Sequence, residues 1–187
     1  EEWTMMMDGG KRGLMWKNIY KRMSDGVDSY TSAKAKWTKE LHSILKAHEK
    51  RLSARGKIHS GMMKKDSLGR TTELIWNDPM EMIGFLLHTG NESNLDKLLG
   101  GYGIERGEWE NAKAELGKKG VIRKEDLELV KKLWNLAEDL KPLSQSVFKK
   151  MFGHRFEEIE AMPISFILAD GTVETLPGGY WPAIADS

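Results

Sequence analysis

The side chains best suited to acid–base chemistry are five histidines and a carboxylate cluster late in the chain. His154 precedes Glu157, Glu158 and Glu160, and an imidazole near a carboxylate can act in general acid–base catalysis. The same run of charges is also typical of a solvated surface before a hairpin. A hydrolase that uses His154 with Glu157 or Glu158 is therefore one alternative, and the pattern by itself predicts no catalytic residue.

No motif in the sequence supports a metal or cofactor site. Cysteine is absent, no HExxH pattern occurs, and His42 and His48 are six residues apart, which places them on different faces of a helix. We expect His48 to be a packing residue with a hydrogen-bond partner. The sequence also lacks a phosphate loop, a dinucleotide fingerprint and a nucleophile elbow. We predict no metal ligands and no cofactor.

The charges are unevenly distributed along the chain although the net charge is +1. Residues 1–70 hold 16 Lys and Arg against 8 Asp and Glu, and the remainder holds 13 against 20. Two interpretations follow: the basic region docks on the acidic region within one fold, or it binds an external polyanion. We consider residues 11–70 the candidate nucleic-acid contact under the second interpretation.

Aromatic side chains alternate with basic ones in "KRGLMWKNIYKR", near the start of the chain. Single-strand binders use such aromatics to stack on bases. The alternative is that Trp16 anchors a hydrophobic core. The candidate interaction residues here are Lys11, Arg12, Lys17, Lys21 and Arg22.

The N-terminal region has a heptad pattern that predicts a long helix over residues 14–55. Apolar and aromatic residues recur every seven positions at Trp16, Met23, Tyr30, Trp37 and Ile44, which forms an apolar stripe suited to packing on another helix. Gly26 weakens this helix and favours a bend or break. Residues 56–76, which begin with glycine, serine and lysine, are expected to form a loop.

Residues 77–117 carry start and stop signals for short helices. Asp78 can cap the first helix, Pro79 suits its first position, and Glu81 stands three residues after the cap. We expect this helix to end at Gly90.

Two more short helices are expected after Gly90. Asn91 or Ser93 can cap the first of them, which should end at Gly100 and Gly101. Trp109 anchors the next, over about Gly107 to Leu116.

The C-terminal half predicts a second long helix followed by a hairpin. Apolar residues spaced three and four apart predict a helix over 123–152, which Pro142 must kink or split. Two β-prone runs around Asp170-Gly171 predict a β-hairpin over 163–176. The predicted fold is mainly α: a long antiparallel helix pair, short capped helices and a small C-terminal hairpin, in one elongated helical module over residues 1–187.

The chain has no apolar run long enough to cross a membrane, and it opens with "EEWTMMM" without an initiator Met. We expect a soluble fragment of a larger protein. A heptad pattern does not distinguish an intramolecular helix pair from pairing with a second copy, so a homo-oligomer through the apolar stripe is also expected as an alternative.

Three stretches in order, "LLHTGNESNLDKLLGGYG" with Trp109 after it, "LWNLAEDLKPL" and "GGYWPAIAD", resemble the helical region of the large polyvalent proteins of tailed bacteriophages, which include virion-associated and DNA-ejection proteins. The similarity covers roughly Leu14 to Asp186. It implies a structural or protein-interaction module between other modules, in the virion or the host cytoplasm. It also marks Asn91, Glu92 and Asn94 as a candidate interaction surface.

The leading expectation is therefore a non-catalytic structural or protein-interaction module of a phage protein. An alternative is a nucleic-acid-binding module whose N-terminal Lys and Arg neutralise phosphates, with affinity that falls steeply as salt rises. The hydrolase with a His/Glu site is the third alternative.

Overall fold

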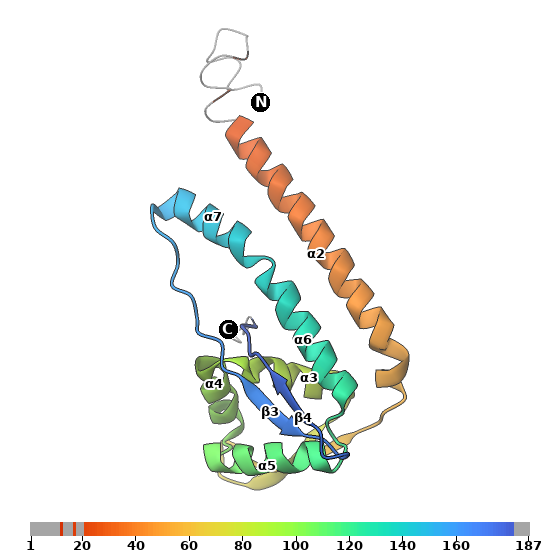
Figure 1. Ribbon diagram of the computed structural model, residues 1–187. Helices are drawn as coiled ribbons and strands as arrows, with labels where there is room; N and C mark the ends of the chain where they lie inside the picture. The colour runs from red at the N-terminus through yellow and green to blue at the C-terminus, as the bar shows by residue number, and fades with distance from the viewer. Residues whose placement is uncertain (1–11, 13–16, 18–20, 182–187) are drawn as a thin grey trace. The chain divides into compact units, whose positions relative to one another are not determined.

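The computed structural model describes residues 12, 17 and 21–181 (Figure 1). The sequence predicted one module, whereas the chain divides into two compact units, Glu1–Ser43 and Ile44–Ser187, which are described separately below. The fold is mainly helical and includes a C-terminal β-hairpin, as predicted.

Helix α2 spans Lys21–Ser53 and is continuous through Gly26, so the helix does not break there. One glycine costs a helix only about 1 kcal/mol, which a helix of this length tolerates. Within the first unit, Trp37 and Leu41 are half-buried, whereas Lys34 and Lys39 are exposed. Lys34 and Leu41 are seven residues apart and lie on the same side of the helix, so the side with Trp37 and Leu41 also carries a basic residue.

Residues 58–76 form an antiparallel hairpin, so the loop expected over 56–76 is wrong. Strand β1 (Ile58–Lys65) pairs with strand β2 (Thr71–Trp76). Side chains of the first half of β1 are alternately buried and exposed, and a hydrophilic serine occupies one buried position, which hides the alternation from a reading of hydrophobicity. The turn is built by Asp66, whose carboxylate accepts from the backbone N–H of Leu68 and of Arg70, both at 2.9 Å.

Helix α3 (Pro79–Leu87) begins as predicted. The Asp78 carboxylate accepts from the backbone N–H of Met80 at 2.7 Å and of Glu81 at 3.1 Å. The Glu81 carboxylate reaches back to the backbone N–H of Asn77 at 2.7 Å, one residue before the cap. After Leu87 the chain makes a short 3₁₀ turn, η2 (His88–Gly90).

The next two helices are α4 (Glu92–Tyr102) and α5 (Arg106–Lys118). They confirm the predicted cap at Asn91 and the anchoring role of Trp109, and they correct the predicted end of α4. Asn91 caps α4 by accepting from the backbone N–H of Asn94 at 2.9 Å, and the Trp109 side chain is fully buried. Helix α4 continues through Gly100 and Gly101 and ends at Gly103, which has a left-handed φ of 62°. The left-handed C-cap, and not the first glycine pair, ends the helix.

Alanine at Gly100 or Gly101 is expected to stabilise the protein by up to about 1 kcal/mol each, because glycine is the poorer helix former. A Cβ at either position would have no atom within 4 Å. Urea unfolding followed by circular dichroism measures the change. Gly103→Ala is the control: it should destabilise, because its φ is +62° and its Cβ would lie 2.9 Å from the Lys65 Cβ. A loss of stability in Gly100→Ala or Gly101→Ala would contradict the placement of these two residues inside α4.

Pro142 splits the long C-terminal helix in two, one of the outcomes that the sequence allowed. Helix α6 covers Lys124–Glu138 and helix α7 covers Lys141–Phe152, with Pro142 in the first turn of α7. Proline is favourable there because its missing N–H would have no partner inside the helix.

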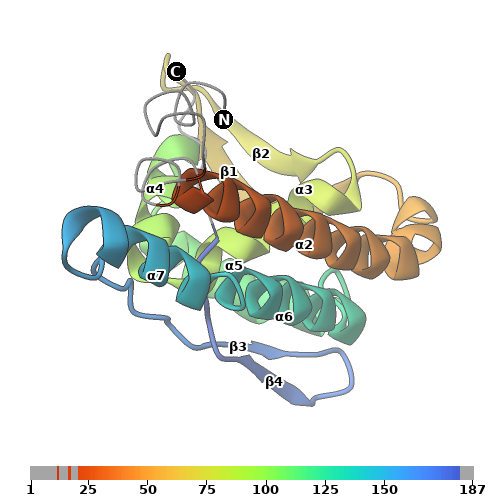
Figure 2. The same ribbon diagram turned by 90° about the horizontal axis from the view of Figure 1, so that it is seen from above.

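The predicted C-terminal hairpin is confirmed. Strands β3 (Ile164–Ile167) and β4 (Val173–Leu176) pair antiparallel around the Asp170-Gly171 turn. Figure 2 shows the two hairpins on opposite sides of α5 and α6, and α5 contacts both β1 and β3. The chain then enters residues 177–181, here called the C-terminal segment.

Large aromatic side chains join these elements into the core of the second unit. The Phe85 ring on α3 lies 5.5 Å from the Trp76 ring on β2 and 5.4 Å from the Trp109 ring on α5, measured between centroids. Trp76, Trp109, Trp134 and Phe166 are among the largest fully buried side chains. Burial of such rings dominates the stability of a core of this size.

Candidate functional site

Residues from three distant stretches of the chain, 86–103, 133–143 and 178–181, meet around the buried indole of Trp134. Its Nε1 donates to the carbonyl oxygen of Leu87 at 3.0 Å. A Cβ at Gly90 would lie 2.5 Å from Trp134 Cζ2, and one at Gly179 would lie 2.7 Å from Trp134 Cγ. Both positions therefore require glycine, because the backbone lies so close to the same ring that a side chain would collide with it. Trp134 belongs to the apolar stripe of the helix predicted over 123–152, and it is covered by η2 and the C-terminal segment.

The polar stretch after Gly90 holds the C-terminal segment. Asn91 Nδ2 donates to the carbonyl oxygen of Gly179 at 3.3 Å, and Asn94 Nδ2 donates to that of Trp181 at 2.7 Å. Both Asn side chains are buried. The expectation that Asn91 and Asn94 form an interaction surface is therefore wrong: their amides are used to cap α4 and to bind the main chain.

Glu92, the third residue of that candidate surface, is exposed. Its carboxylate lies 2.8 Å from Arg106 Nη2, and this hydrogen bond lowers the pKa of Glu92 and raises that of Arg106. Arg106 also lies 2.9 Å from Asp96. Glu92 thus remains accessible, but its charge is balanced within α4 and α5.

Main-chain hydrogen bonds complete the attachment of the C-terminal segment. The carbonyl oxygen of Gly90 accepts from Met162 N at 2.8 Å and from Gly179 N at 2.9 Å. Gly178 has a φ of 81°, and a Cβ there would lie 2.3 Å from the Met162 carbonyl oxygen. The Gly-Gly pair is thus explained by backbone packing.

The basic candidates near the N-terminus are only partly within the described residues. Arg12, Lys17 and Lys21 are exposed. Lys11 and the side chain of Arg22 lie outside the part of the chain that is described.

Part of the basic excess of residues 1–70 is used inside the second unit. Asp126, at the start of α6, is fully buried and forms ion pairs with Arg51 and with Arg55, whose Nη1 lies 2.8 Å from Asp126 Oδ2. Arg55 also donates to the carbonyl oxygen of Val121 at 2.6 Å. The last turn of α2 is thereby attached to the first turn of α6. For these two arginines, the pairing supports the interpretation that basic residues of the N-terminal region dock on acidic residues within one fold.

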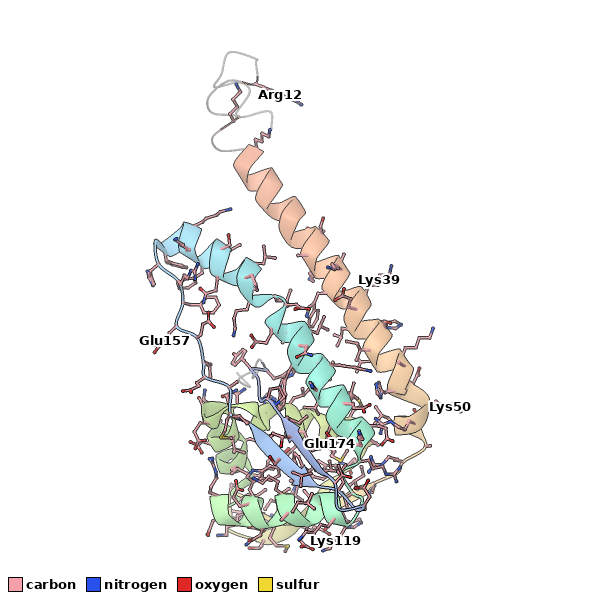
Figure 3. The ribbon with its side chains drawn as sticks, viewed as in Figure 1. Arg12, Lys39, Lys50, Lys119, Glu157 and Glu174 are labelled. Atoms are coloured by element: carbon pink, nitrogen blue, oxygen red, sulfur yellow. The ribbon has the colours of Figure 1, made fainter. Side chains whose placement is uncertain are left out.

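The histidine and glutamates considered for a hydrolase are not joined. His154 Nδ1 lies 3.1 Å from the carbonyl oxygen of Phe152. Glu158 lies 3.3 Å from Lys141 Nζ and accepts from Gln145 at 3.3 Å, while Figure 3 shows Glu157 directed away from α7. Among the described contacts, none links His154 to either carboxylate.

A His–carboxylate pair that sequence reasoning missed lies in a cleft of about 600 Å³ between the β1–β2 hairpin and α5. His59 Nδ1 lies 2.7 Å from Glu73 Oε2, and Glu73 Oε1 accepts from Gly61 N at 3.0 Å. The His59 hydrogen bond and the Gly61 amide lower the pKa of Glu73. The carboxylate can orient this imidazole, but the neighbouring Ser60 hydroxyl is buried and donates to the Leu74 carbonyl oxygen at 2.7 Å.

A second hollow, of about 390 Å³, lies along α7 and the loop after it; we call it the α7 groove. Its lining is mostly basic and polar: Lys141, Pro142, Gln145, Ser146, Lys149, Arg155 and Glu158. Such a lining attracts anions.

Comparison of the chain with protein-family models, curated proteins and solved structures finds no match. Within the described residues, no three His, Asp or Glu side chains are grouped so that they could hold a metal ion. No helix among those residues has both the length and the apolar character needed to cross a membrane.

Stability is expected to fall as the pH drops below about 6.5, the pKa of an unfolded histidine. Burial lowers the pKa of His88 in the folded chain, and burial together with Arg51 lowers that of His48. The unfolded chain therefore binds protons at a higher pH than the folded chain, which favours unfolding. The Tm at pH 7.5 should exceed that at pH 5.5, and His48→Gln with His88→Gln should narrow the difference. An unchanged difference would contradict the assignment to these two groups.

Proposed function

We propose that this chain is a non-catalytic structural or protein-interaction module of a large polyvalent or virion-associated protein of a tailed bacteriophage. The proposal is supported by the way the three stretches with the family resemblance fit together. The observation that carries it is the binding of the C-terminal segment by the buried amides of Asn91 and Asn94.

Packing within the fold explains why glycine and asparagine occur at these positions. Gly90 and Gly179 allow close approach to Trp134, and Asn91 both caps a helix and binds a carbonyl group. Buried polar groups need such partners, because an unpaired one costs about 1–3 kcal/mol. The residue types in the three stretches are therefore those that this packing arrangement needs, and we assign no reaction to them. A structural module that occurs in several large proteins would keep such residues.

Mass spectrometry of purified particles tests the virion-associated part of the proposal. The phage that encodes the chain should be grown and its particles purified on a density gradient. We expect tryptic peptides such as residues 125–131, "EDLELVK", to sediment with infectious particles. Peptides found only in the soluble fraction of infected cells would contradict a virion location. A coding sequence with no phage genes around it would contradict the proposal as a whole.

A further inference from the structure

The α7 groove contains two cations without an acidic partner. Lys149 and Arg155 are exposed and line the groove, and neither forms an ion pair with any described residue. Lys141 is different, because Glu138 lies 2.6 Å and Glu158 lies 3.3 Å from its Nζ. The single carboxylate of the groove, Glu158, is therefore already engaged. The two remaining positive charges make the groove a site for an anion.

The main chain next to Arg155 is held by a buried side chain that lines the groove. Gln145 is 8% exposed, and its amide binds the main chain of Phe156 in both directions. Phe156 N donates to Gln145 Oε1 at 3.1 Å, and Gln145 Nε2 donates to the Phe156 carbonyl oxygen at 3.0 Å. The loop that carries Arg155 is thus attached to α7 before any ligand arrives, which reduces the entropy lost on binding.

An exposed aromatic ring lies next to Lys149 on the surface of α7. Phe152 is 56% exposed, although a ring of this size is normally buried. It follows Lys149 by three residues in α7, so the two side chains are neighbours on the helix surface. The Phe148 ring lies 4.5 Å from it, between centroids, and also packs on Phe156 at 5.5 Å. Phe152 is therefore supported from below and open to solvent.

We propose that the α7 groove binds the backbone of a single-stranded nucleic acid, with phosphates on Lys149 and Arg155 and a base stacked on Phe152. A cationic groove beside an exposed aromatic ring is the combination that single-strand binders use, because an unpaired base can leave its neighbours and stack on the ring. The bases of a duplex are already stacked and cannot do so. This inference does not depend on the proposed phage setting.

The site differs from the one that the sequence indicated. The sequence pointed to basic residues 11–70, but within the second unit Arg51 and Arg55 pair with Asp126, and Arg70 pairs with Asp66. The unpaired charges of the α7 groove lie in residues 71–187, the part of the chain with the acidic balance, where a net count conceals them.

Fluorescence anisotropy with a labelled oligothymidylate of about 20 nucleotides tests the charges, using the full 187-residue chain at low salt. Lys149→Glu with Arg155→Glu should weaken binding by about tenfold or more, and the Gln pair should weaken it less. The plot of log K against log salt should lose about 0.7 in slope for each phosphate contact removed. Lys131→Glu with Lys132→Glu, two exposed lysines on α6, is the matched control and should bind like the wild type.

Phe152→Ala tests the stacking step. It should weaken binding of the oligothymidylate by about tenfold and leave binding of an abasic strand of equal length unchanged. Circular dichroism of each variant checks that it is folded. Equal affinities of the α7 and α6 charge variants would overturn the site, and equal binding of single strands and duplex would overturn the single-strand specificity. Binding of anionic phospholipid vesicles without any binding of oligonucleotide would also overturn the proposal.

Discussion

Replacement of Asp126 by asparagine is expected to destabilise the second unit by about 3 kcal/mol or more. The substitution keeps the size of the side chain but removes the negative charge that Arg51 and Arg55 share. Their side chains are only 24% and 11% exposed, so two guanidinium groups would remain largely buried without a counter-ion. Removing one partner of a buried ion pair typically costs about 3–5 kcal/mol.

Urea unfolding, followed by tryptophan fluorescence and circular dichroism, measures this loss. Asp139→Asn is the matched control, because Asp139 is exposed at the end of the same helix and undergoes the same chemical change. The control should unfold at nearly the wild-type urea concentration. Similar midpoints for the two variants would show that the ion pairs contribute little.

Replacement of Gly90 by alanine is expected to cost about 3 kcal/mol and to release the C-terminal segment. The added Cβ would lie 2.5 Å from the Gly179 carbonyl oxygen and 2.5 Å from Trp134 Cζ2. A buried indole and a hydrogen-bonded backbone would both have to move, and overpacking of this kind usually costs about 1–3 kcal/mol. The Gly90 carbonyl oxygen would also lose its good alignment with Gly179 N.

Gly84→Ala is the matched control for this effect. Gly84 lies inside α3, and a Cβ there would have no atom within 4 Å, so the variant should be as stable as the wild type or slightly more stable. Limited proteolysis by chymotrypsin after Tyr180 should be faster in Gly90→Ala alone. Equal stability and equal cleavage of the two variants would mean that the C-terminal segment is not held at Gly90.

Local signals in the sequence predicted the starts of helices well. Asp78 and Asn91 cap the helices that follow them, and Pro142 stands in the first turn of α7. Each of these effects acts within one turn of chain, so residue type and position suffice to predict it. The end of α4 was less predictable, because only the conformation of Gly103 distinguishes it from Gly100 and Gly101.

The β1–β2 hairpin was missed because its first strand does not show hydrophobic alternation. Ser60 is buried in a position where an apolar residue is expected, since its hydroxyl donates to the Leu74 carbonyl oxygen. The available signal was the β-prone run "TTELIW" after Asp66 and Gly69, a turn pair. Without the hairpin, His59 and Glu73 could not be brought together, so this cleft could not be predicted.

The partners of buried side chains were also beyond the sequence. A periodic apolar stripe indicates that one side of α6 is buried, but it does not indicate what covers Trp134. Similarly, Lys149 and Arg155 stand in an ordinary run of charges, and only the tertiary fold shows that Gln145 attaches the loop containing Arg155 to α7. The sequence pattern gives no information about which residues distant in the chain contact one another.

The attachment of Gly179 to Asn91 joins residues 88 positions apart, which has a consequence for synthesis on the ribosome. While residues 135–177 are being translated, the face of Trp134 that the Gly-Gly pair will cover is open to water and to other nascent chains. Contacts of such long separation form late, since closure of a long loop must precede them. Translation that halts before residue 178 should therefore yield an aggregation-prone product, and a chaperone that shields exposed indoles would be needed longest at this stage.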